Sequence, residues 1–262
     1  MTDEITRFNK ERWEELARAN VEYSRPFLDL DPASAHKLVD PFGLLGDPAG
    51  KEVLCLAGGG GQQSAAYALL GARVTVLDLT ETQLQRDRQA AAHYGLQVRT
   101  VQGDMRDLSS FAPLSFDIVR HPFSINFVPQ ALQVFLQVQR VIRPGGIYHM
   151  DCANPFTAGI DEGSWDGTGY RISQPYVDGG EYSQVNPYWD IGGEDGSTQS
   201  ILGPREFRHT LSTLINGLAS LGFVILRFQE GPDSDPAAPP GSWGHFLRLA
   251  PLFMSFWTVY HE

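Results

Sequence analysis

Residues 51–78, KEVLCLAGGGGQQSAAYALLGARVTVLD, decide how this chain folds. The apolar run Val53 to Ala57 predicts a buried strand, the four consecutive glycines Gly58 to Gly61 predict a tight turn, and a helix follows. A second strand, Arg73 to Leu77, ends on an acid, Asp78. Glycine has no Cβ, so backbone N–H groups can approach a ligand closely, and a carboxylate after the next strand can accept both hydroxyls of a ribose. The stretch indicates a mononucleotide site, with an ordinary strand-to-helix turn as the alternative.

Strand and helix continue to alternate beyond this stretch. A helix over Glu81 to Tyr94 begins after Thr80, a suitable N-cap, and ends at Gly95, and another starts at Pro129. The further strands are predicted at 96–101, 116–120 and 147–151. This alternation is typical of a doubly wound, parallel sheet. An amphipathic helix over 205–221 precedes two last strands, 223–230 and 252–260.

The chain divides by composition into four segments. We expect an N-terminal helical cap at 1–50, a nucleotide-binding core at 51–156, an insertion at 157–204 and the completion of the core sheet at 205–262. Within the cap, helices are predicted over 9–23 and 33–39. The insertion has no helical period, and it holds ten glycines, six Tyr or Trp residues and eight acids against one base between Thr157 and Gly203. This texture predicts a small antiparallel flap or ordered loops.

Composition restricts the classes of partner. The chain of 262 residues carries a formal net charge of −11 and has no cluster of Lys or Arg, which argues against a nucleic-acid partner. No apolar run is long enough to span a bilayer, and residues 1–25 are unlike a signal peptide. Two cysteines, Cys55 and Cys152, fit a reducing compartment. We therefore expect a cytoplasmic protein with small-molecule ligands, no membrane partner and no metal site.

The order of motifs over about residues 51–262 resembles the class I S-adenosylmethionine-dependent methyltransferases. In that family the first strand and turn read approximately V-L-D-L-G-C-G-T-G, and here they are VLCLAGGGG at 53–61. Asp78 matches the acid that binds the ribose, and Gly103-Asp104-Met105 is similar to the segment that reads the adenine. His121 matches the motif after the fourth strand, and RPGG at 143–146 is similar to the turn before the fifth.

This resemblance implies a Rossmann-like methyltransferase fold: a seven-stranded, mostly parallel sheet of order 3-2-1-4-5-7-6 whose last strand is antiparallel. It also implies S-adenosyl-L-methionine as the cofactor. The chain departs from the family pattern at Cys55, where an acid is usual, and at Ala57, where a glycine is usual. Backbone carbonyls of Ala57 and His121 are then expected to take the contact to the methionine amino group.

The cofactor contacts expected on this basis come from the cap, the glycine turn and the residues that follow the strands. They are Tyr23, Ala57, Gly58, Gly59, Gly61, Gln63, Asp78, Leu79, Gly103, Asp104, Met105 and His121. Several have a plain structural alternative: Asp78 and Asp104 can cap turns, Leu79 and Met105 can be core, and His121 can be a buried structural histidine.

Methyl transfer from a sulfonium requires mainly an in-line approach of the acceptor, so positioning supplies much of the rate. A general base matters only for a hydroxyl or a protonated amine, and His121 and then Tyr170 are the candidates for it. The aromatic and acidic insertion, including Trp165, Asp166 and Tyr170, suits a cationic small-molecule acceptor through cation–π contact; alternatively its aromatics form a core of their own. The competing functions are a nicotinamide-dependent oxidoreductase and a non-catalytic protein that binds the cofactor or its demethylated product.

Overall fold

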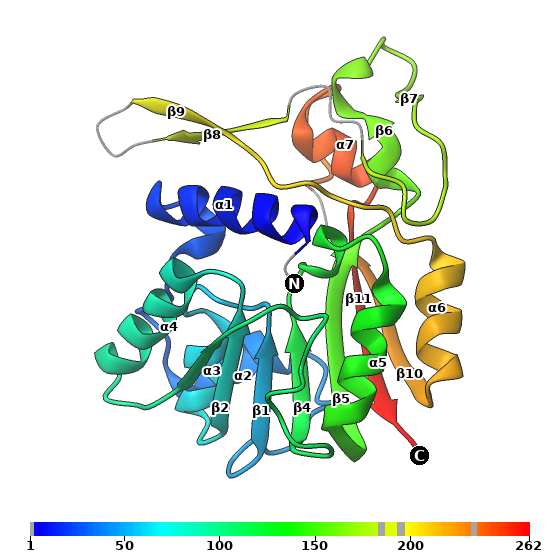
Figure 1. The fold of residues 1–262 in the computed structure, drawn as a ribbon. Coiled ribbons are helices and arrows are strands. Elements are labelled where there is room, and N and C mark those ends of the chain that lie inside the picture. Colours follow the sequence, from blue (N-terminus) through cyan, green and yellow to red (C-terminus); the bar gives the residue numbers. More distant parts are fainter. Residues whose placement is uncertain (1–2, 183–186, 193–196, 232–234) are drawn as a thin grey trace.

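A seven-stranded sheet forms the centre of the molecule (Figure 1). The computed structural model describes residues 3–182, 187–192, 197–231 and 235–262. The strand order is β10-β11-β5-β4-β1-β2-β3, and β11 runs antiparallel to its neighbours β5 and β10. The strands are β1 (Glu52–Leu56), β2 (Arg73–Asp78), β3 (Arg99–Gln102), β4 (Phe116–His121), β5 (Ile142–Ala153), β10 (Phe223–Gly231) and β11 (Phe253–Tyr260). The predicted order 3-2-1-4-5-7-6 with an antiparallel last strand is confirmed.

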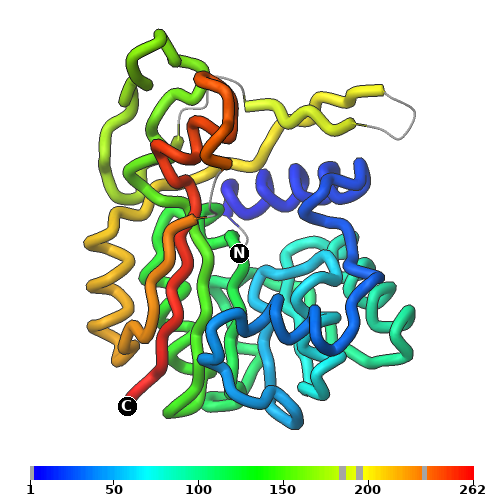
Figure 2. Tube along the Cα trace, turned by 180° about the vertical axis from the view of Figure 1, so that it is seen from behind, coloured from blue at the N-terminus to red at the C-terminus, as the bar shows by residue number. Residues whose placement is uncertain are grey.

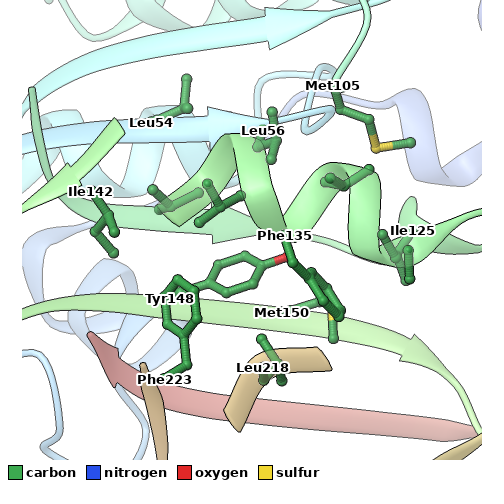
Figure 3. Close-up of a cluster of buried hydrophobic side chains, with 14 of the residues drawn as sticks. Leu54, Leu56, Met105, Ile125, Phe135, Ile142, Tyr148, Met150, Leu218 and Phe223 are labelled. Atoms are coloured by element: carbon green, nitrogen blue, oxygen red, sulfur yellow. The ribbon is translucent and has the colours of Figure 1, made fainter. Parts of the chain in front are cut away.

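Helices cover both faces of the sheet, as Figures 1 and 2 show from opposite sides. The helices are α1 (Glu4–Arg18), α2 (Pro32–Val39), α3 (Gln63–Leu69), α4 (Glu81–His93), α5 (Ala131–Val141), α6 (Leu211–Ser220) and α7 (Trp243–Leu249). β1 is buried on both sides: Leu54 and Leu56 pack into one core with side chains of α5 and α6, and Val53 and Cys55 pack into the other with side chains of α2, α3 and α4. Figure 3 shows the first core, where Phe135 of α5 packs against Tyr148 of β5. Successive side chains of a strand point to opposite faces of the sheet. Because both faces of β1 are covered, the whole run is apolar.

Several element boundaries differ from the predictions. α1 begins at Glu4 because Asp3 caps it at Thr6 N, and it ends at Arg18, well before the predicted end. β3 begins at Arg99 rather than at 96. α6 begins only at Leu211, where the Thr210 hydroxyl accepts from Thr213 N, so the segment from 205 is not helical.

The helix α7 was not predicted. The Ser242 hydroxyl caps it by accepting from His245 N, and Phe246 buries its apolar face. Its seven residues are too few to establish a helical period in the sequence. The proline-rich segment before it includes residues 232–234, which lie outside the described residues.

The insertion after β5 forms two small antiparallel pairs, in agreement with the predicted flap. β6 (Ile160–Asp161) pairs with β7 (Arg171–Ile172), and β8 (Tyr188–Gly192) pairs with β9 (Thr198–Leu202). The β8–β9 hairpin lies above α1 (Figure 1), and its Ile191 and Ile201 pack with Leu16 of that helix. Residues 183–186 and 193–196 of the insertion lie outside the described part.

Candidate active site

A cavity of about 1400 Å³ opens at the carboxyl ends of β1, β2, β4 and β5. This is the edge at which doubly wound sheets bind their ligands. Ten of the twelve residues predicted to contact the cofactor line it: Tyr23, Ala57, Gly58, Gly59, Gln63, Asp78, Leu79, Gly103, Asp104 and Met105. The other two, Gly61 and His121, are not among the residues that line the cavity. The fold therefore brings residues that are distant in the sequence together around one cavity.

The glycine turn is shaped by two carboxylates beneath it. Gly59 N–H donates to Asp78 Oδ2 over 3.1 Å, and the N–H groups of Gly60 and Gly61 donate to the two oxygens of Asp87, over 3.1 and 3.0 Å. This corrects the expectation that the turn presents its N–H groups to a ligand, because these three amides are bound to side chains of β2 and α4. Asp87 was not predicted, since only folding brings the middle of α4 beneath the turn.

The absence of side chains in the turn is required by close packing. A Cβ on Gly59 would lie 2.6 Å from Gln83 Cβ and 2.9 Å from Asp78 Cγ. Gly61 has a φ of +75°, and a Cβ there would lie 2.6 Å from the carbonyl oxygen of Arg86. The turn therefore brings backbone against both the acid at the end of β2 and the first turns of α4.

Asp78 both organises the end of β2 and faces the cavity. Its Oδ1 accepts from the N–H and the hydroxyl of Thr80, each over 2.9 Å, and its Oδ2 accepts from Gly59. Burial raises the pKa of Asp78, and the hydrogen bonds from Thr80 and Gly59 only partly oppose this rise. The capping role and a ligand-facing role are therefore compatible in one carboxylate.

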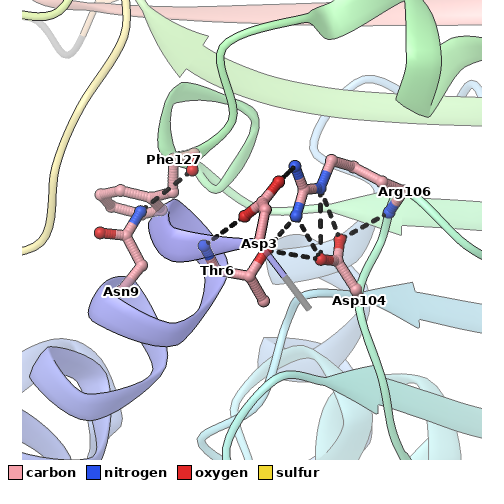
Figure 4. A network of polar contacts seen from close by, with 6 residues as sticks. All are labelled: Asp3, Thr6, Asn9, Asp104, Arg106 and Phe127. Carbon is pink, nitrogen blue, oxygen red and sulfur yellow. Dashed lines mark hydrogen bonds and ion pairs between the residues drawn. The ribbon is translucent and has the colours of Figure 1, made fainter. Parts of the chain in front are cut away.

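Asp104 is held in a network that ties α1 to the core (Figure 4). Its Oδ2 accepts from Thr6 Oγ1 over 3.0 Å and from Arg106 Nη2 over 2.7 Å, and its Oδ1 accepts from Arg106 N. Arg106 Nη1 also donates to Asp3 Oδ2 over 2.7 Å. Burial tends to raise the pKa of Asp104, but hydrogen bonds and charge from Arg106 outweigh it and the pKa is lowered.

Neither candidate base has its side chain in the cavity wall. The His121 ring is fully buried, its Nδ1 lies 2.9 Å from Tyr148 Oη, and burial with the charge of Arg120 lowers its pKa to about 3. The Tyr170 hydroxyl lies 3.0 Å from His245 Nδ1, and its ring packs against Phe246 of α7. Each side chain has a structural environment of its own, and a role for either as a base stays a prediction.

A charged pair that was not predicted lies in the wall between β4 and β5. Arg120 Nη2 pairs with Asp151 Oδ2, and Asp151 Oδ1 accepts from Ser255 Oγ over 2.7 Å. Burial tends to raise the pKa of Asp151, but the charge of Arg120 together with the interactions of His149 and Ser255 outweighs it, and the pKa is lowered. Arg120 directly follows the apolar pair Ile118 and Val119 in a central strand, and this was the available signal in the sequence. Apolar residues also line the cavity: Phe123, Trp243, Phe246, Leu252, Phe253 and Met254.

Comparison with known proteins assigns the family. Residues 54–150 match the family model described as a methyltransferase domain. An uncharacterized methyltransferase, YbaJ of Bacillus subtilis, is 37% identical over 183 residues, which are 69% of each chain. The ubiquinone biosynthesis O-methyltransferase of Pseudomonas savastanoi is 31% identical over 122 residues, or 47% of this chain and 51% of that protein. This chain belongs to the class I S-adenosylmethionine-dependent methyltransferases.

Solved structures support the same fold. An S-adenosylmethionine-dependent methyltransferase of Mesorhizobium loti superposes with a TM-score of 0.62 at 20% identity, covering 87% of this chain and all of that one. Across the described ranges, no helix is long and apolar enough to cross a membrane.

Proposed function

We propose that this chain transfers the methyl group of S-adenosylmethionine directly to nitrogen or oxygen of a small-molecule acceptor bound in the same cavity. The observation that carries the proposal is the cavity itself. Its volume of about 1400 Å³ exceeds the roughly 300–1,000 Å³ typical of a pocket for one small ligand. A cofactor and an acceptor therefore fit side by side, which a protein that only binds the cofactor does not require.

The residues of the glycine turn and the following strands fit a sulfonium cofactor. In the proposed complex Asp78 accepts from the ribose, and Met105 and Leu79 contact the adenine; that all three line the cavity supports this assignment. The carboxylates of Asp78 and Asp87 engage three amides of the turn, so this turn offers fewer free N–H donors to an anion. A dinucleotide needs such donors for its pyrophosphate. The arrangement thus favours S-adenosylmethionine over a nicotinamide cofactor.

The chain contributes chiefly by holding the two reactants in line. When bound, the cofactor supplies an electrophilic methyl group on its sulfonium. The apolar wall from Phe123 and Phe253 excludes water, and the Arg120–Asp151 pair offers the acceptor polar contacts from β4 and β5, on the other side of β1 from Asp78. Because positioning can supply most of the rate, this mechanism does not depend on His121 or Tyr170. The relative from Pseudomonas savastanoi carries the name of an O-methyltransferase, which agrees with a small acceptor.

Calorimetric titration tests the proposal, with S-adenosylmethionine, its demethylated product S-adenosylhomocysteine and NADH added separately to the wild type and to Asp78→Ala. We expect micromolar binding of the first two ligands, weakened at least about tenfold in the variant because a hydroxyl contact to a charged group is lost and the Gly59 amide loses its acceptor. Asp29→Asn, an exposed residue outside the cavity, is the control and should bind as the wild type does. Binding of NADH alone would refute the proposal. A screen of aromatic amines and phenols with labelled cofactor then identifies the acceptor.

A further inference from the structure

Asp87 is a buried carboxylate that is hydrogen-bonded to the glycine turn and to the start of α3. It lies in the middle of α4, its side chain is fully buried, and it does not line the cavity. Oδ2 accepts from Gly60 N–H over 3.1 Å, and Oδ1 accepts from Gly61 N–H over 3.0 Å and from the Ser64 hydroxyl. One carboxylate thus fixes two turn residues and the first turn of α3. Burying a charge is costly, and the three hydrogen bonds offset part of this cost.

We propose that ionised Asp87 is the positioning residue of the cofactor turn, and that its protonation releases the turn and lowers affinity for the cofactor. This inference rests on the proposed function, because it takes the turn to be where S-adenosylmethionine binds. A carboxylate accepts three donors without a proton of its own, whereas a carboxylic acid presents a hydroxyl hydrogen toward donors that already point at it. The Ser64 hydroxyl can turn and accept that hydrogen, so protonation chiefly weakens the charge-assisted bonds that hold the Gly60 and Gly61 amides.

The environment places this titration near neutrality. Burial raises the pKa of Asp87 to about 7, opposed by the hydrogen bonds from Ser64, Gly60 and Gly61 and reinforced by the negative charge of Asp78. The neutral thiol of Cys55 faces it from β1, in the position where the family resemblance expects an acid. The chain thus carries the buried negative charge on α4 rather than on β1.

The other charged groups around the turn are bound elsewhere. Arg120, from β4, pairs with Asp151. Glu14, from α1, accepts from Glu81 N and Thr82 Oγ1 at the start of α4. Arg86, the residue before Asp87, donates to Ala17 O. Among the described residues, burial, the charge of Asp78 and the glycine and serine donors are therefore what sets the protonation of Asp87.

The test measures the affinity of the full chain for S-adenosylhomocysteine between pH 6 and pH 8.5. If binding requires the ionised form, wild-type affinity should rise about tenfold from pH 6 to pH 8 and then level off, since one pKa unit corresponds to a factor of ten. Asp87→Asn cannot titrate, so its affinity should be about tenfold weaker at pH 8 and nearly constant with pH. Asp29→Asn is the control and should reproduce the wild-type profile.

Ser64→Ala separates a positioning role from a merely structural one. It removes one donor to the carboxylate and leaves the charge, so the midpoint of the affinity profile should move to higher pH. This variant also covers the case in which Asp87→Asn does not fold. A flat wild-type profile, or an unmoved midpoint in Ser64→Ala, would overturn the inference while leaving the proposed function intact. No binding of S-adenosylhomocysteine by the wild type at pH 8 would overturn both.

Discussion

Ala57 occupies a left-handed backbone conformation at the residue where β1 enters the glycine turn. Its φ is +46°, and its N–H donates to Leu77 O over 2.7 Å. The family resemblance expects glycine here, and a residue with a Cβ in this region loses roughly 1–2 kcal/mol. The hydrogen bond to β2 and the surrounding core hold it in place. The conformation is thus set by the turn rather than by the preference of alanine.

We predict that Ala57→Gly leaves the free energy of unfolding unchanged or raises it by up to about 1 kcal/mol, because relief of the strain exceeds the added entropy of the unfolded chain. Ala66→Gly, inside α3, is the matched control and should lower stability by about 1 kcal/mol or more. Urea denaturation measures both. Equal losses in the two variants would contradict the strain argument.

At the scale of elements, polar side chains attach the start of α1 to the core. Arg106 joins Asp3 and Thr6 of the helix start to Asp104, as Figure 4 shows. Asn9 adds a second anchor, because its Nδ2 donates to Phe127 O and to Arg205 O, each over 3.0 Å. The helix forms one wall of the cavity, so its attachment bears on ligand access.

We predict that Arg106→Ala lowers the free energy of unfolding by about 1–3 kcal/mol, the loss of a partly buried, charge-assisted network. Hydrogen exchange should show faster exchange in α1 and no change in β1 and β4. Arg88→Ala breaks an exposed ion pair with Glu81 and should cost less than about 0.5 kcal/mol. Uniform acceleration of exchange throughout the protein would show that α1 is not separately anchored.

The β8–β9 hairpin and α1 share a small aromatic cluster. Trp189 makes an edge contact with Trp13 at 5.7 Å and with Tyr23 at 6.2 Å between ring centroids. Trp189 thus packs against aromatic residues of the N-terminal cap rather than in a core of the insertion's own, and it also lines the cavity. The cationic acceptor remains a prediction.

Trp189→Ala should therefore loosen the hairpin and α1 together, with a loss of about 1–3 kcal/mol from removal of the indole. Hydrogen exchange in α1 and in β8 measures this loosening. Tyr188→Ala removes the exposed neighbour on the opposite face of the strand and serves as the control. Normal protection of α1 in Trp189→Ala would exclude this coupling.

At the scale of the whole molecule, buried histidines make stability depend on pH. His149 stacks on Trp257 at 3.6 Å between ring centroids, and burial with the charge of Arg120 lowers its pKa to about 4. The unfolded chain, with a pKa of about 6.5, binds the proton first as pH falls. This contribution to stability is complete above pH 6.5 and is lost progressively between about 6.5 and 4. Asp87 acts in the opposite sense, because its raised pKa favours the folded state as pH falls below 7.

Between pH 7 and pH 5, we predict that the free energy of unfolding falls by about 2 kcal/mol less in His149→Gln than in the wild type, because the titrating group is gone. Glutamine keeps an amide near Ser255, with which His149 Nε2 makes a 2.9 Å contact. Urea denaturation at the two pH values measures the difference. Because Asp87 is present in both proteins, its opposite contribution cancels, and identical pH dependences would contradict the prediction.

The sequence by itself determined the order of the core strands and of the helices between them. Local patterns sufficed for this: an apolar run, four glycines and a second strand that ends on an acid predict two paired strands, and this pairing brings Asp78 beside the turn. The sheet order followed from the family resemblance. Helix boundaries were predicted less accurately, because caps such as Asp3 and Thr210 fix where a helix begins and the apolar periodicity does not show that position.

Only the tertiary structure decided which polar groups meet. Asp87 lies 26 positions beyond Gly61, and Asp151 lies 31 beyond Arg120, so neither pairing has a local signature. It also placed the side chains of His121 and Tyr170 outside the cavity wall, in contacts with Tyr148 and His245. Periodicity tells which face of an element is buried, whereas the choice of partner within the buried interior depends on how the elements pack together.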